Sequence, residues 1–138
     1  MKVLVSACLL GENCKYNGGN NFSAAVAKFI EGKEVIPVCP EVLAGMPTPR
    51  TPMELVNGIA TDAHGVVWDA ALRRAVAEIL AGIDMKEIEC AVLQSRSPTC
   101  GSKQVYDGTF SRRLIPGAGI LAQALMDAGI RVVDAEDL

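Results

Sequence analysis

Short apolar runs alternate with segments of helical periodicity along this chain. Four of the runs predict buried strands, over residues 3–5, 34–38, 88–93 and 130–133. Between them, apolar side chains recur three and four positions apart and predict three helices, over residues 23–30, 69–82 and about 117–128. Strands that alternate with helices are typical of a parallel sheet covered on both faces. We therefore expect a small three-layer α/β domain.

The segments between these elements predict loops. Four prolines, at positions 40, 47, 49 and 52, exclude a regular helix or a central strand from residues 39–52. Residues 59–68 alternate around the turn Asp62-Ala63-His64-Gly65 and predict a small hairpin, in which the only histidine would be structural. Residues 95–117 predict a long loop after the third strand, with Asp107-Gly108 marking a turn.

Length and charge exclude several classes of protein. The chain has 138 residues, half of them hydrophobic, so we expect one domain over residues 1–138 with a single core. Its 13 basic and 16 acidic residues give a net charge of -3, which argues against broad binding to nucleic acid or to a membrane surface. The apolar run before Cys8 is too short for a secretory signal, and no segment approaches the roughly 20 apolar residues of a membrane span. Five cysteines in such a chain are typical of reduced thiols, so we expect a cytoplasmic protein.

Three of the cysteines share one setting, the loop directly after a predicted strand. Cys8, Cys39 and Cys100 follow the first three strands, and the carboxyl ends of parallel strands meet at one edge of a sheet. Three converging thiolates suit a soft metal or an iron-sulfur cluster, but no CxxC pair is present and unrelated buried cysteines would show the same spacing. Cys90 lies within a strand and is expected to be a buried apolar residue, while Cys14 stays without a role.

The three cysteine-bearing segments are mildly basic in an otherwise acidic chain. Residues 8–22, 39–58 and 95–116 contain six basic and four acidic side chains, a net charge of +2. The basic residues are Lys15, Arg50, Arg96, Lys103, Arg112 and Arg113. Four aromatic residues also lie there, namely Tyr16, Phe22, Tyr106 and Phe110. This composition favours an anionic or polar substrate with a planar ring, although packing beneath the loops explains the aromatic residues equally well.

The cysteine motifs resemble those of one bacterial enzyme family, which includes the thiouracil desulfidase and the 4-thiouridine desulfidase. The motifs are VSACLLGENCKYNGG, VIPVCPEVLAGMPTPR and SRSPTCGSKQVYDGTF, followed by GAGILAQALMDAGIRVV, and the resemblance covers essentially the whole chain. It implies a Rossmann-like α/β domain with long cysteine-bearing loops at the carboxyl ends of the strands. It also implies a 4Fe-4S cluster on three cysteines and a non-redox reaction that replaces the sulfur of a thiolated pyrimidine by oxygen.

The resemblance assigns roles to individual residues. It implies that Cys8, Cys39 and Cys100 ligate the cluster, that Glu41 is the acid/base carboxylate and that Ser97 is a supporting hydroxyl. The chain departs from the expected family pattern at Gln94, Thr99 and Trp68. Residues expected to contact an anionic part of the substrate are Lys15, Arg50, Arg96 and Lys103.

Two other functions remain open from the sequence. A Zn²⁺ hydrolase would use the same three cysteines and Glu41 as its base, and a non-catalytic module would carry a cluster or a persulfide. Iron, sulfide and zinc content after anaerobic purification separates these alternatives. The expected substrate is 4-thiouridine, free or within tRNA, with 2-thiouracil as the alternative, and the net charge limits affinity for RNA to a modest, salt-dependent level. The oligomeric state is not predicted.

Overall fold

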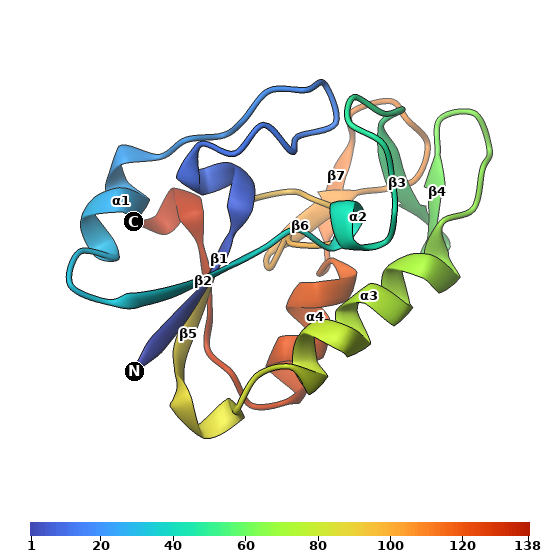
Figure 1. Ribbon diagram of the computed structural model, residues 1–138. Coiled ribbons are helices and arrows are strands. Elements are labelled where there is room, and N and C mark those ends of the chain that lie inside the picture. The colour runs from blue at the N-terminus through green and yellow to red at the C-terminus, as the bar shows by residue number, and fades with distance from the viewer.

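The computed structural model describes residues 1–138 and is built around a four-stranded parallel sheet with the strand order β2-β1-β5-β8 (Figure 1). The strands are β1 (Lys2–Ser6), β2 (Glu34–Val38), β5 (Ile88–Leu93) and β8 (Val132–Asp134). In the paired registers, Leu4 of β1 lies opposite Ile36 of β2 and Ala91 of β5. The predicted parallel sheet is confirmed, and β2 and β5 have the predicted bounds.

Helices cover both faces of the sheet, with α1 on one side and α3 and α4 on the other (Figure 1). Their bounds are α1 (Ala24–Phe29), α3 (Asp69–Ala81) and α4 (Ile120–Asp127). Because side chains alternate along a strand, Leu4 packs with Leu72 of α3 and Leu121 of α4, whereas Val5 packs with Val26 of α1. This confirms the three-layer arrangement. No helix is long and apolar enough to span a membrane.

Several short helical turns complete these layers. They are the 3-10 turns η1 (Ala7–Leu10), η2 (Met85–Glu87) and η3 (Ala135–Asp137) and the single α-helical turn α2 (Pro40–Leu43). The prolines of this region led us to exclude a regular helix, but Pro40 occupies the first helical position, where no backbone N–H is needed. The expected N-cap of α1 is confirmed, since the Ser23 hydroxyl accepts a hydrogen bond from the Val26 amide at 3.2 Å.

Two antiparallel hairpins were not predicted at their positions. One joins β3 (Met53–Val56) to β4 (Ile59–Asp62), and the other joins β6 (Gln104–Tyr106) to β7 (Leu114–Pro116). The hairpin expected over residues 59–68 is present only in reduced form, as an isolated antiparallel bridge between Thr61 and Val67 with backbone hydrogen bonds from Asp62 to Val66 at 2.8 Å and from Trp68 to Ala60 at 2.9 Å. The first hairpin instead turns at Asn57-Gly58, where φ values of 51° and 80° match the type I′ turn that Asn-Gly favours.

Candidate active site

Three cysteines lie at the carboxyl ends of three neighbouring strands. Cys8 lies in η1 after β1, Cys39 follows β2 at the N-cap of α2, and Cys100 lies in the loop after β5. All three line one cavity of about 590 Å³, and all five cysteines of the chain are free thiols. The predicted convergence of Cys8, Cys39 and Cys100 on one cavity is therefore present in the structure. Cys90 is 1% exposed in β5, as expected of an apolar core residue.

The loop that carries Cys100 is fixed by the first turn of α4. The Ile120 amide donates to the Pro98 carbonyl at 3.1 Å, and the Leu121 amide donates to the Thr99 carbonyl at 2.8 Å. Gly119 makes this contact possible, because a Cβ there would stand only 2.4 Å from the Thr99 carbonyl carbon. The helix that packs against the sheet thus sets the position of the third cysteine.

The surroundings of the three thiols are largely desolvated. Burial raises the pKa of the Cys8 thiol, and burial together with the nearby Glu41 carboxylate raises the pKa of Cys39. The same two causes raise the pKa of Cys100 to about 12. Asn21 donates from its amide nitrogen to the Cys8 sulfur at 3.6 Å. Ionised sulfurs at these positions would need a positive partner, which is the environment that a bound metal centre supplies.

Glu41 lies against the thiols and accepts a hydrogen bond from a hydroxyl of the loop that carries Cys100. Its Oε2 accepts from the Cys39 thiol at 3.8 Å, and its Oε1 accepts from the Thr99 hydroxyl at 3.0 Å. The Thr99 hydroxyl also lies 3.0 Å from the Ser97 hydroxyl, whose oxygen accepts from the Cys100 amide at 3.1 Å. Because the Thr99 proton points to the carboxylate, the Ser97 proton points to Thr99. The result is a hydroxyl chain from Ser97 through Thr99 to Glu41.

The predicted basic residues fall into two groups. Lys15, Arg50, Arg96 and Arg112 line the cavity, whereas Lys103 and Arg113 do not. Lys103 is instead paired with Asp137 at 2.9 Å.

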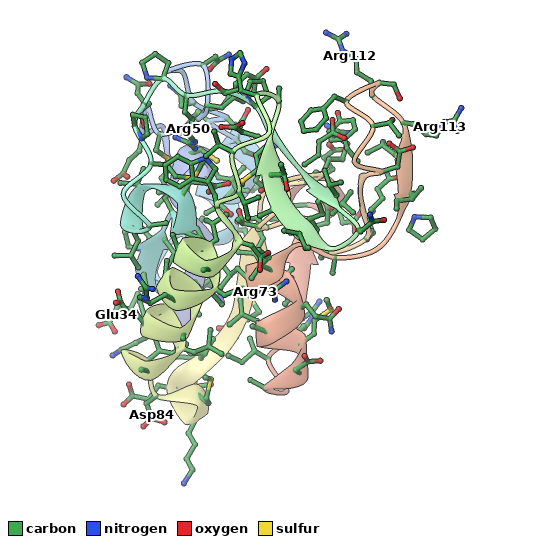
Figure 2. All side chains as sticks on the ribbon, turned by 90° about the vertical axis from the view of Figure 1, so that its right-hand side faces the viewer. Glu34, Arg50, Arg73, Asp84, Arg112 and Arg113 are labelled. Carbon is green, nitrogen blue, oxygen red and sulfur yellow. The ribbon has the colours of Figure 1, made fainter.

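Two of the lining residues are already engaged with the protein. Arg96 pairs with Glu136 at 2.6 Å, and Arg50 donates to the Cys14 carbonyl at 2.8 Å. Figure 2 shows Arg112 and Arg113 at the outer end of the β6–β7 hairpin, and Arg50 among the cysteine-bearing loops. Lys15 and Arg112 are therefore the lining cations that form neither an ion pair nor a side-chain hydrogen bond with the protein.

The cavity contains residues that the sequence did not single out as a group. Cys14 lines it beside Cys8 and Cys39, and the cavity is also lined by Glu54 of β3 and by Pro52, which directly precedes that strand. Three of the four loop aromatic residues also line it, namely Tyr16, Tyr106 and Phe110. Phe22 does not, and its side chain is 60% exposed elsewhere. We call the surface formed by Cys8, Cys39, Glu41 and Cys100 the cysteine wall, and the surface formed by Glu54, Tyr106 and Phe110 the hairpin wall.

The cysteine wall fits a metal centre in its donor chemistry. Thiolates are soft ligands that suit an iron-sulfur cluster and also a zinc ion. As the side chains lie here, no three His, Cys, Asp or Glu residues are close enough together to hold a single metal ion. Iron, sulfide and zinc content therefore decides between the two kinds of centre.

Comparisons with known proteins place the chain in a family. The family model described as 2-thiouracil desulfurase matches residues 3–137, so the chain belongs to the 2-thiouracil desulfurase family. It is 35% identical to the uncharacterized protein YbbK of Bacillus subtilis strain 168 over 146 residues, which cover 99% of this chain and 97% of that protein. Its fold matches the solved structure of the 4Fe-4S-dependent thiouracil desulfidase TudS with a TM-score of 0.91. That match has 32% identity and covers 99% of this chain and 92% of the other.

Proposed function

We propose that this protein is a 4Fe-4S-dependent desulfidase that replaces the sulfur of a thiolated pyrimidine by oxygen. The observation that carries the proposal is the cysteine wall, in which three free thiols from three adjacent strand ends line one cavity beside Glu41. Family membership and the likeness to the desulfidase TudS support the same reaction.

The three cysteines suit the cluster in their chemistry and in their number. Cys8, Cys39 and Cys100 are soft sulfur donors in a desolvated cavity, where burial raises their thiol pKa values and favours a cationic partner. A cluster on three thiolates supplies one iron without a protein ligand, a soft Lewis acid for the sulfur of a thiocarbonyl group.

Glu41 is the proposed acid/base residue. Its Oε1 is held by the Thr99 hydroxyl at 3.0 Å, and its Oε2 lies on the side of Cys39. A carboxylate in this position takes a proton from the water that attacks the thiolated carbon and delivers it to the departing sulfur, so that the C–S bond breaks as the C=O bond forms and both protons of the water leave with the sulfur as hydrogen sulfide. Ser97 supports the Cys100 loop and Thr99, because its hydroxyl oxygen accepts from the Cys100 amide and its proton is directed to the Thr99 hydroxyl.

The proposed substrate is 4-thiouridine, free or within tRNA, with 2-thiouracil as the alternative. The cavity of about 590 Å³ is of the size that accommodates small ligands. Lys15 and Arg112 line the cavity and can bind a phosphate group, while the net charge of -3 limits the affinity for a whole tRNA. Five free thiols fit a reducing compartment, so we place the reaction in the cytoplasm.

The test is an anaerobic assay on cluster-loaded protein. Iron, sulfide and zinc are first quantified, and sulfide release is then followed with 2-thiouracil, 4-thiouridine, its monophosphate and thiolated tRNA. We expect iron and sulfide in a cubane ratio and sulfide release from at least one of these substrates. Zinc in place of iron, or an intact cluster with no sulfide from any substrate, would overturn the proposal.

A further inference from the structure

The lining of the cavity contains an unusual concentration of left-handed backbone. Four residues other than glycine have a positive φ, and three of them, Arg96, Phe110 and Arg112, line the cavity. The fourth, Asn57, lies in the type I′ turn where such a conformation is ordinary. A bulky aromatic side chain such as Phe110, at φ 57°, is disfavoured there and persists only where its surroundings hold it.

Glu54 of β3 holds Phe110 in this conformation. Its Oε1 accepts from the Gly108 amide at 3.0 Å and from the Phe110 amide at 3.1 Å. The Glu54 side chain forms no ion pair, although the residue is only 9% exposed. Gly108 lies directly on β3, since a Cβ there would stand 2.7 Å from the Leu55 carbonyl oxygen. A buried carboxylate thus fixes the backbone of a loop that lies more than fifty positions further along the sequence.

The held loop presents an aromatic ring to the cavity. Phe110 lines it and is still 37% exposed, although a phenylalanine that only packed beneath the loop would be buried. Tyr106 of the same hairpin lines the cavity as well. Planar nucleobases stack on exposed aromatic faces, and this contact contributes substantially to binding without contacting the reacting atoms.

We propose that the pyrimidine ring of the substrate stacks on Phe110, and that Glu54 is the residue that positions this ring. The identity of the ligand as a pyrimidine rests on the function proposed above. Phe110 is therefore a substrate-binding residue of the hairpin wall, and Glu54 is a positioning residue that acts through Phe110.

The first test compares leucine and tyrosine at position 110 in the cluster-loaded protein. Phe110→Leu keeps an apolar side chain but removes the ring, and should raise KM for 4-thiouridine about tenfold with little change in kcat. Phe110→Tyr keeps the ring face and should keep the KM of the unchanged protein. Phe22→Leu is the matched control, because this aromatic residue also lies on a loop but outside the cavity. An unchanged KM in Phe110→Leu would overturn the proposal.

Glu54 is tested by the same separation of KM from kcat. Glu54→Ala removes the acceptor of both loop amides and should reproduce the KM rise of Phe110→Leu, whereas Glu54→Gln keeps one side-chain oxygen as acceptor and should lie in between. Combining Glu54→Ala with Phe110→Leu should add little to either single change. Fully additive effects would show that Glu54 does not act through Phe110.

A binding measurement separates this inference from the proposed reaction. Uridine carries no sulfur, so its binding can be followed by ligand-observed NMR without any turnover. Phe110→Leu should weaken uridine binding by about the same factor as it raises KM. If no thiolated substrate releases sulfide but uridine binding still depends on Phe110, the proposed reaction fails and the stacking site stands. Equal uridine binding by Phe110→Leu and by the unchanged protein would overturn the stacking site whatever the reaction.

Discussion

The two walls of the cavity each contain one glutamate, and the two carboxylates are held in different ways. Glu41 on the cysteine wall accepts from the Thr99 hydroxyl and the Cys39 thiol, both of which are groups that exchange protons. Glu54 on the hairpin wall accepts from the backbone amides of Gly108 and Phe110, which are too weakly acidic to transfer a proton to a carboxylate. The first arrangement suits proton transfer, and the second fixes a loop. In the function proposed here, the cysteine wall performs the chemistry and the hairpin wall recognises the substrate.

The largest effect is expected on the cysteine wall itself. Cys39→Ser should abolish cluster retention and sulfide release, because a serine oxygen is a poor ligand for iron that thiolates hold. Iron and acid-labile sulfide per chain, together with activity after anaerobic reconstitution, provide the measurement. Cys90→Ser is the control, since its thiol lies 1% exposed in β5, away from the cavity, and should cost stability but leave the cluster content unchanged. Full cluster content in Cys39→Ser would remove Cys39 from the ligand set.

The next effect separates the two glutamates directly. Glu41→Gln should retain the cluster but lower kcat by about 10²–10⁴, the usual contribution of a positioned acid or base. Glu54→Gln, the same chemical change on the other wall, should act on KM through the loop that carries Phe110. The measurement is kcat and KM of both variants with the same substrate. Similar losses of kcat in the two variants would show that the two glutamates do not have separate roles in chemistry and recognition.

The cysteine wall was largely predictable from the sequence, because it depends on local patterns. Apolar runs located the strands, and the carboxyl ends of parallel strands place their following residues together, which brought Cys8, Cys39 and Cys100 to one cavity. The assignment of Glu41 came from a resemblance to a known family, and its contact with Thr99 joins residues 58 positions apart that no periodicity connects.

The aromatic residues of the hairpin wall were named from the sequence, but the hairpins that position them were missed for physical reasons. Strands β6 and β7 have only three residues each, too few for an alternating pattern to stand out. Asn57-Gly58 is a strong turn signal, but the alternation of residues 59–68 drew the predicted hairpin to the later turn at Asp62. At that turn the Asp62 carboxylate accepts from the His64 and Val66 amides at 2.9 Å, and the backbone pairing beyond it is limited to a single bridge between Thr61 and Val67.

A smaller effect is expected for Thr99, which links Glu41 to Ser97. Thr99→Val keeps the shape of a fully buried side chain but removes the donor to Glu41 Oε1, and should lower kcat about tenfold, equivalent to roughly 1.4 kcal/mol, with KM nearly unchanged. Thr99→Ser restores a hydroxyl and should recover most of the rate. Cluster content is measured in parallel, and a loss of iron in Thr99→Val would indicate that Thr99 supports Cys100 instead of Glu41.

The smallest effect concerns the charges near the cavity, where the structure separates residues that the sequence grouped together. Lys15 and Arg112 line the cavity without an ion pair, whereas Lys103 lies outside it and is paired with Asp137. The double change Lys15→Ala/Arg112→Ala should raise KM for 4-thiouridine monophosphate roughly threefold at low salt and less at high salt, because exposed charges are screened. KM for 4-thiouridine itself should not change, since it carries no phosphate.

Lys103→Ala is the control and should leave both values unaltered. An equal effect of the double change on both substrates would mean that these cations shape the cavity and do not bind a phosphate. An effect of Lys103→Ala would show that Lys103 contributes to substrate binding.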